Sequence, residues 1–275
     1  MKLGKGFSIF AGKQCTAYGG IEFDLNPIEI YEYSDMIENM SNFMTGLNIG
    51  YDINAHQQLN LQILDSRNGS FNKTYGVETE DGEQPTIESG KLPLVYTLNW
   101  NGNFNDVFKT RWSASIMNEA KDKNLYYFAF GNELNLNKFN MFLDFMYSKE
   151  GIDRKGIMTG ITGSMEGHNA FDAGYFSMVT KLNYRFLPKW NAFVKGMYET
   201  ASLTKQQGDL EKGKYRTAWG YFAGVEFYPM DTNLHFFLTY VGRSYDFTAR
   251  AKALGQENYS TNRVSVGFIY QLPMF

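Results

Sequence analysis

Charged side chains recur at every second position of several predicted strands, on the face opposite to the apolar residues. The basic members are Lys109, Arg111, Lys181, Arg185, Lys195, Arg216 and Arg243, and the acidic members are Asp52, Asp144, Glu199 and Glu226. A charge buried in protein costs several kcal/mol unless it is paired, so this many inward charges predict a water-filled interior. Two interpretations stay open: a balanced, solvated wall, or a basic excess that selects anions.

Side chains that could perform catalysis or hold a cofactor do not occur in a recognisable pattern. The sequence has no phosphate-binding P-loop, no G-x-S-x-G, no H-E-x-x-H and no C-x-x-C. The single cysteine and three scattered histidines have no partners at the spacing of metal ligands. By strand parity His235 lies on the inward face, whereas a barrel hydrolase would need its histidine on the outer wall. We therefore expect neither an enzyme nor a cofactor nor a bound metal.

Composition narrows the class of protein further. The 275 residues include 17% aromatic residues and 27 glycines, with a net charge of −3 and no basic run, which argues against a nucleic-acid partner. No stretch of about 18 apolar residues is present, so no helix is expected to cross a membrane. The first residues, MKLGKGFSIFAGKQ, lack a long apolar core and a cleavage site. The expectation for the N-terminus is therefore truncation or processing.

The elements that must position the charged residues are strands, because apolar and polar residues alternate along most of the chain. At the end of the chain Val264, Val266 and Phe268 share one face, opposite Ser265 and Gly267. The same pattern recurs about 12 times, in segments long enough to cross a bilayer at the usual tilt. The apolar face carries Tyr and Trp at strand ends, as a membrane girdle does, and the other face is polar.

Connections of alternating length indicate how these strands are joined. The short ones are 54–58, 101–106, 136–138, 187–190 and 228–233, and the long ones are 15–41, 66–91, 149–173, 202–214 and 243–261. Residues 118–123 are the exception, because they form a short connection at a position where the alternation requires a long loop. Short periplasmic turns alternating with long extracellular loops are typical of outer-membrane barrels. The sequence thus predicts one domain over residues 1–275, an antiparallel transmembrane β-barrel.

The first long connection, residues 15–42, is unusually apolar and acidic for an exposed loop. Folding into the barrel interior would cover its apolar side chains, narrow the pore and bring its carboxylates to the basic wall. Those carboxylates are Glu22, Asp24, Glu29, Glu32, Asp35 and Glu38, and the last four are the candidates for such a constriction. The acidic and partly periodic residues 28–44 also predict a short helix within the loop. Packing at an oligomer interface, or over the outer mouth, is the alternative.

The sequence resembles the phosphate-selective porin O and P family. The resemblance is carried by GFSIFAGKQCTAYGG with the following NPIEIYEYSDM, by MTGLNIGYDI, and by the terminal VSVGFIYQLPMF, which ends on Phe275. It implies a 16-stranded trimeric porin of a Gram-negative outer membrane, and, with about 12 strands here, a chain that lacks its first strands. The family's anion selectivity implies inward arginines and lysines, but the acidic first loop and negative net charge depart from an anion-capturing pore.

Taken together, these patterns predict an outer-membrane porin, a passive diffusion channel for small hydrophilic solutes or anions. Its expected partners are the lipid bilayer, those solutes and two further copies in a homotrimer. The alternative is a non-transport barrel with a structural or binding role, whose interior is plugged and whose loops engage a partner.

Overall fold

The computed structural model describes residues 2–4, 6–40, 43–66, 93–163, 169–230 and 234–270. Its strands form one antiparallel sheet in which every strand pairs with its neighbours in the sequence. Those strands are β1 (Lys2–Gly4), β2 (Phe7–Cys15), β3 (Phe43–Asn54), β4 (Gln57–Asp65), β5 (Leu94–Phe104), β6 (Phe108–Ala120), β7 (Lys123–Leu136), β8 (Phe139–Ile152), β9 (Phe171–Leu187), β10 (Trp190–Leu203), β11 (Gly213–Phe227), β12 (Leu234–Phe247) and β13 (Tyr259–Tyr270).

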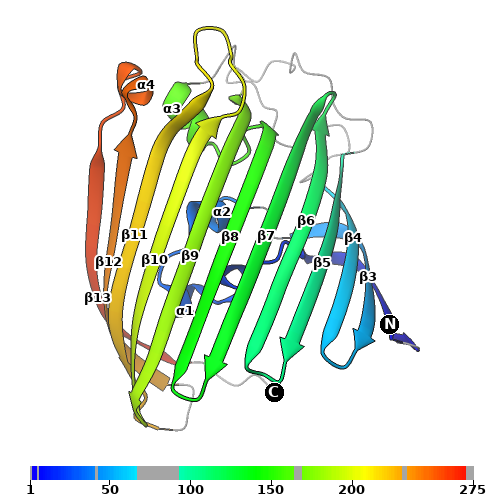
Figure 1. Ribbon diagram of the computed structural model, residues 1–275, viewed down its shortest axis with the longest axis vertical. Coiled ribbons are helices and arrows are strands. Elements are labelled where there is room, and N and C mark those ends of the chain that lie inside the picture. Colours follow the sequence, from blue (N-terminus) through cyan, green and yellow to red (C-terminus); the bar gives the residue numbers. More distant parts are fainter. Residues whose placement is uncertain are drawn as a thin grey trace.

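The sheet is a curved wall with two free edges (Figure 1). It has 13 strands, and β1 and β13 lie at its ends with no pairing between them among the described residues. Strand β1 has three residues, while β2–β13 have nine or more, so the prediction of about 12 crossing strands is confirmed. No helix within the described part of the chain is long and apolar enough to cross a membrane.

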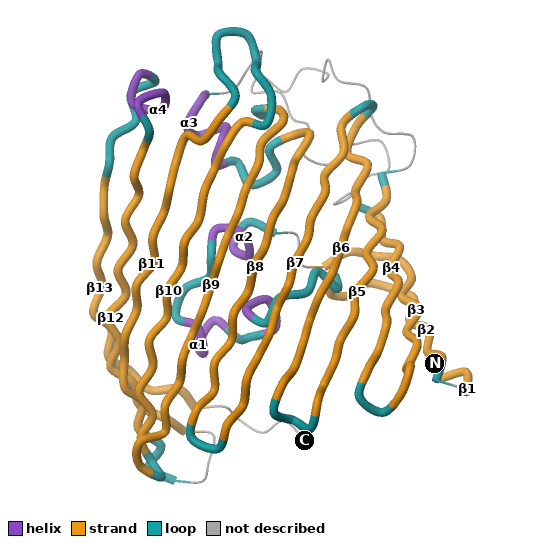
Figure 2. Tube along the Cα trace, in the orientation of Figure 1, coloured by secondary structure: helices purple, strands orange, loops and turns teal. Residues whose placement is uncertain are grey.

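Short helices lie only in the connections between strands. They are the 3-10 turn η1 (Glu22–Asp24), α1 (Pro27–Ile30), α2 (Asp35–Glu38), α3 (Ile157–Thr162) and α4 (Ala249–Ala253). The β8–β9 and β12–β13 connections, with α3 and α4, lie at one end of the wall, and the short hairpin turns, except that between β6 and β7, lie at the other (Figure 2). The expected alternation is therefore present, and so is its exception, because β6 and β7 are joined by a tight turn. The connection over 67–92 and the terminal Phe275 lie outside the described residues.

Local chemistry explains the tight turns. Asn105 and Asp106, between β5 and β6, have φ of 56° and 57°. Two consecutive residues with positive φ form the type I′ turn that matches the twist of a hairpin, and Asn and Asp tolerate this conformation best. The turn then fixes the register, with Phe104 opposite Phe108 and Trp100 opposite Trp112. Alternate residues of both strands therefore face the same side.

The convex face of the wall is apolar and exposed. Leu98, Phe130, Val194 and Trp219 are each between 46% and 53% exposed. Near the short turns, aromatic pairs join neighbouring strands, such as the stacked rings of Phe139 and Tyr184, 4.5 Å apart. A continuous apolar surface of this size is unstable in water but is what a lipid-facing barrel wall requires, with aromatic rings at the interface.

Candidate functional site: the inward face and the segment that covers it

The connection between β2 and β3 does not extend away from the wall. Residues 16–40, called here the inward segment, cross the concave side of the sheet at mid-height, where α1 and α2 lie behind the strands in Figure 1. Five of its apolar side chains are buried there: Tyr18, Ile21, Ile30, Met36 and Ile37. The Tyr18 ring packs edge-on against Tyr127 of β7 with centroids 5.3 Å apart, and Tyr31 stacks on Phe193 of β10 at 4.8 Å.

One carboxylate and one glycine of the wall hold the start of the inward segment. Asp144 of β8 is fully buried and accepts hydrogen bonds from the backbone N–H groups of Ile21 (2.9 Å) and Glu22 (2.7 Å). Beside it, a Cβ on Gly131 of β7 would lie 2.7 Å from the Cα of Gly20 and 2.8 Å from the nitrogen of Ile21. The backbones can therefore approach this closely only because position 131 has no side chain.

A buried ion pair fixes the segment at η1. The Lys195 ammonium of β10 lies 2.7 Å from Glu22 Oε1, and both side chains have no exposed surface. The other oxygen of Glu22 accepts a 2.5 Å hydrogen bond from the Ser34 hydroxyl, which closes the segment on itself. Lys195 also donates to the carbonyl oxygen of Glu32 at 2.5 Å. Each charge thus has the partners that burial requires.

Arg243 of β12 is the centre of a second, larger network. Its guanidinium lies 2.7 Å from Glu199 of β10, 3.0 Å from Asp35 and 3.1 Å from Glu32. Arg216 of β11 pairs with the same Asp35 carboxylate. Glu199 belongs to the wall, and the other two acids belong to the inward segment. The planar guanidinium of Arg243 therefore joins β12, β10 and the inward segment, a role for which the several N–H donors of arginine are suited.

Two phenol groups of the inward segment stay neutral where they are buried. Burial raises the pKa of Tyr31, and the carboxylate of Glu226 raises it further. The Tyr31 hydroxyl accordingly donates a 2.8 Å hydrogen bond to Glu226 of β11. Burial likewise raises the pKa of Tyr33, with a contribution from the charge of Glu22, and its hydroxyl donates to the Leu25 carbonyl oxygen.

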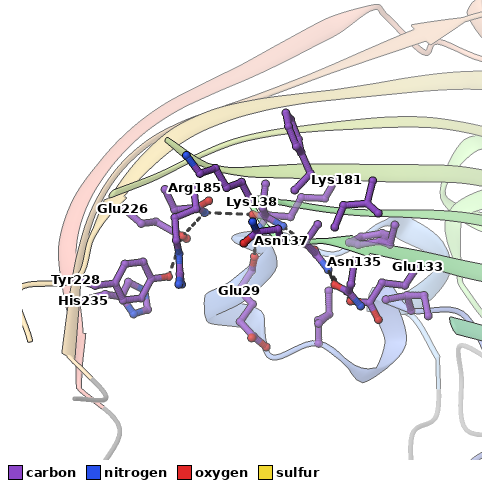
Figure 3. A pocket seen from close by; sticks show the side chains of 18 residues that line it. Glu29, Glu133, Asn135, Asn137, Lys138, Lys181, Arg185, Glu226, Tyr228 and His235 are labelled. Carbon is purple, nitrogen blue, oxygen red and sulfur yellow. Dashed lines mark hydrogen bonds between the residues drawn. The ribbon is translucent and has the colours of Figure 1, made fainter. Parts of the chain in front are cut away.

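Beside the inward segment, the concave face retains two hollows. The first, of about 670 Å³, is lined by Glu29 of α1 together with residues of β7–β12, and Figure 3 shows Glu29 among the side chains around it. The second, of about 690 Å³, lies against β3–β7. Ile21, Leu25 and Glu133 line both hollows, so the segment separates them.

Comparison with known proteins identifies the family. The sequence model of the family described as phosphate-selective porin O and P matches residues 1–272. The chain belongs to this family. Among curated proteins, no sequence matches it.

Solved structures show that the porin has the fold of outer-membrane barrels. It is similar to a loop L8 deletion mutant of OmpT, an outer membrane protein of Vibrio cholerae, with a TM-score of 0.54 and 10% identity, covering 95% of this chain and 74% of that one. It is also similar to OccAB3 of Acinetobacter baumannii, with a TM-score of 0.52 and 12% identity, covering 98% of this chain and 65% of that one. At these identities the likeness concerns the fold alone.

Family and fold together place the porin in the outer membrane, with the convex face of the sheet against the lipid bilayer and small solutes as its cargo. Membership of a porin family points to a channel rather than an enzyme. Within the described residues no group of three or more His, Cys, Asp or Glu side chains is arranged to hold a metal ion.

The structure brings most of the basic candidates of the porin to the inward segment. Lys195, Arg216 and Arg243 pair with its acids as described. Arg111 of β6 pairs with Asp24, and Lys181 of β9 donates to the Glu29 carbonyl oxygen. The remaining two lie apart from it. Lys109 is 3.9 Å from Glu133, while Arg185 is exposed beside the first hollow.

The four acidic candidates separate into two pairs. Glu32 and Asp35 meet the wall arginines. Glu29 instead accepts a hydrogen bond from the Asn26 backbone, and Glu38 is exposed on α2. Glu22 and Asp24, two further carboxylates expected to face the basic wall, pair with Lys195 and Arg111 and hold the start of the segment. Sequence reasoning missed Gly131 of β7, which lets the backbone of the segment lie against the wall.

Proposed function

We propose that this porin is a passive diffusion channel for small hydrophilic solutes, in which the concave face lines the lumen and the inward segment forms the constriction. This proposal rests on the ion pairs that hold the segment against the wall. They are Arg111–Asp24, Lys195–Glu22, Arg216–Asp35 and Arg243–Asp35. A loop held at mid-height by buried charges narrows the path at a fixed place. On this proposal residues 1–275 are one barrel domain.

The family name raises the question of phosphate. Four of the seven basic candidates, Arg111, Lys195, Arg216 and Arg243, have a carboxylate of the inward segment as partner. A cation that is already neutralised by a fixed carboxylate attracts a passing anion weakly. Of the other three, Lys109 lies 3.9 Å from the Glu133 carboxylate and Lys181 is buried against the Glu29 carbonyl oxygen, so an anion preference would depend mainly on Arg185. We propose a channel with weak anion preference rather than strong phosphate capture.

Reconstitution of the purified porin into a planar bilayer tests the proposal. Stable open-channel current steps are expected, and the reversal potential in a salt gradient gives the ion preference. An electrically silent protein that is folded, as shown by its heat-dependent gel mobility, would refute the channel and favour the non-transport barrel. Permeation of phosphate at a much higher rate than chloride would refute the weak preference.

The oligomeric state is a further proposal. The family resemblance implies a homotrimer whose contacts lie on the convex face, where exposed aromatic residues are abundant. Mass measurement of the detergent complex checks this. A mass corresponding to one chain would exclude the trimer.

A further inference from the structure

A row of amide side chains crosses the wall below the inward segment. Asn140 of β8, Asn183 of β9 and Asn191 of β10 follow one another across the strands, with Glu133 of β7 at one end and Glu226 of β11 at the other. Hydrogen bonds join them: 2.6 Å from Asn140 to Glu133, 3.0 Å from Asn183 to Asn140, 3.4 Å from Asn191 to Asn183 and 2.8 Å from Asn191 to Glu226. This amide row lines the first hollow.

The carboxylates at the two ends of the amide row fix the orientation of the outer amide groups. Ionised carboxylates only accept hydrogen bonds, so the Asn140 and Asn191 nitrogens both turn toward them. Each amide offers two N–H donors and two acceptor lone pairs. Asn183 uses one donor toward Asn140 and one lone pair toward Asn191. Asn140 and Asn191 use both of their donors, Asn140 toward Glu133 and Asn135, and Asn191 toward Asn183 and Glu226. The row therefore offers one unused N–H group, on Asn183, and unused lone pairs on its amide oxygens, at the surface of a hollow of about 670 Å³, a size typical of small-molecule sites.

An aromatic platform stands at the Glu226 end. The rings of Tyr228 and His235 lie 5.0 Å apart, and Figure 3 shows them side by side at the edge of the hollow. The Tyr228 hydroxyl donates a 3.0 Å hydrogen bond to Glu226, which fixes the ring relative to the row. An aromatic ring beside hydrogen-bonding groups suits a solute with an apolar face and a polar edge.

Charge in the hollow argues against an anion as its occupant. Three carboxylates, Glu29, Glu133 and Glu226, face three cationic side chains, Lys138, Lys181 and Arg185. Phosphate beside the amide row would meet the carboxylates at both ends of it, and such like-charge contacts are unfavourable. A neutral solute with many hydroxyl groups can donate to the carboxylates and amide oxygens and accept from the remaining N–H group of Asn183 and from Arg185.

We infer that the amide row is a subsite for neutral polyhydroxylated solutes, that is, saccharides, which it holds transiently below the constriction. This inference rests on the proposed channel function and names the solute class. The second hollow extends the same chemistry, because Gln57, Gln58 and Asn101 line it.

Maltose titration of the open channel tests the inference, with inorganic phosphate and a polyethylene glycol of similar size as comparison solutes. The current should fall to a saturating limit with maltose, and only in proportion to viscosity with the polymer. Asn183→Leu keeps the side-chain volume and removes the amide. It should raise the half-saturating maltose concentration about 2- to 10-fold, the factor expected for loss of one neutral hydrogen bond. Asn118→Leu, an amide at the far end of β6, should leave it unchanged.

The outcomes separate this inference from the channel itself. An open channel without saturable block by maltose, or with block by phosphate only, overturns the saccharide subsite and leaves the channel intact. Equal effects of the two substitutions also overturn it. If no current is seen, the channel is refuted, and calorimetric titration of the detergent-solubilised protein with maltose decides the subsite. A measurable heat of maltose binding, with weaker binding in Asn183→Leu than in the wild type, supports the subsite. The absence of any heat of binding overturns it. Heat-dependent gel mobility verifies that each variant is folded, and Asn183→Ser replaces a variant that is not.

Discussion

Two regions of the concave face differ in the kind of polar side chain that they carry and in how deeply it is buried. Behind the inward segment the wall presents full charges, Lys195, Glu199, Arg216 and Arg243, all of them buried. Below the segment, toward the short turns, it presents the amide row, whose members Asn140, Asn183 and Asn191 are only partly buried. One region binds a part of the same chain, and the other borders open space.

The difference follows from the cost of burying charge. A buried ion is stable only with a partner of opposite sign and with further hydrogen bonds, and the segment supplies both to Arg243. A buried charge therefore marks a place where the structure must stay closed. An amide carries no such requirement and exchanges its hydrogen bonds with water or solute at low cost. The charged region thus holds the constriction in place, and the amide region remains available to solutes that pass through the channel.

Removing Arg243 should have the largest effect on the charged region. In Arg243→Ala, Glu199, Asp35 and Glu32 lose their shared guanidinium, and breaking a buried ion pair costs about 3–5 kcal/mol. We expect the free energy of unfolding in urea, measured in lipid vesicles, to fall by about that amount. The loosened segment should also increase current noise in single-channel records.

The matched control is Lys205→Ala, because Lys205 pairs with Asp172 at 2.9 Å while its side chain is 63% exposed. Exposed pairs contribute about 0–1 kcal/mol. Equal losses in the two variants would show that the Arg243 network does not hold the segment.

The Lys195–Glu22 pair should show strong coupling. Lys195→Met leaves the Glu22 carboxylate buried without its counter-ion, and should cost about 3 kcal/mol. Adding Glu22→Gln removes that unpaired charge and should restore part of the loss, with a coupling energy between about 0.5 and 3 kcal/mol. Urea unfolding of the two single variants and the double variant measures it. Strict additivity would mean that the two side chains do not interact in the folded porin.

Gly131→Ala should disturb the segment without changing any charge. The added methyl group would meet Gly20 and Ile21, and overpacking of this kind costs about 1–3 kcal/mol. The expected result is a lower unfolding midpoint together with a higher conductance, because the segment is lifted from the wall. Gly196→Ala is the control, since its methyl group would lie 3.8 Å from the nearest heavy atom, on Thr180. If Gly131→Ala behaved like this control, the segment would not rest on β7.

Charge reversal on the open part of the wall should have the smallest energetic effect and still be measurable. Arg185→Glu changes the local charge by two units, which at about 10 Å in water alters an ion's free energy by about 0.8 kcal/mol, favourably for a cation and unfavourably for an anion. Each effect is roughly fourfold, so the cation-over-anion permeability ratio should rise by about 16-fold. Arg111→Glu should shift the reversal potential less, because the new carboxylate would lie beside Asp24 and two adjacent carboxylates do not both stay fully ionised, so the charge changes by less than two units. A larger shift for Arg111 would reverse the assignment of open and closed regions.

Sequence patterns predicted most of the fold because a transmembrane strand obeys a local rule. Of every two successive residues, one faces lipid and the other faces water. Alternation of apolar and polar residues alone therefore located β3–β13 to within a few residues. The short turns were placed at the breaks between alternating segments, and the positive φ of Asn105 and Asp106 in the structure explains how tight one of them is. The site was only partly predictable. Parity placed Arg243 and Lys195 on the inward face, but it could not show whether such a charge meets solvent or a carboxylate far away in the sequence.

The sequence by itself determined the strands, their order, the face that meets lipid, and the acidic, apolar character of residues 15–42. These properties depend on period, composition and neighbouring residues. Only the tertiary structure decided that Glu22 and Asp35 lie against Lys195 and Arg243, and that three asparagines from separate strands form one row. Such contacts join residues up to about 200 positions apart. Their geometry depends on the curvature of the whole sheet and on how closely a glycine lets the segment approach it.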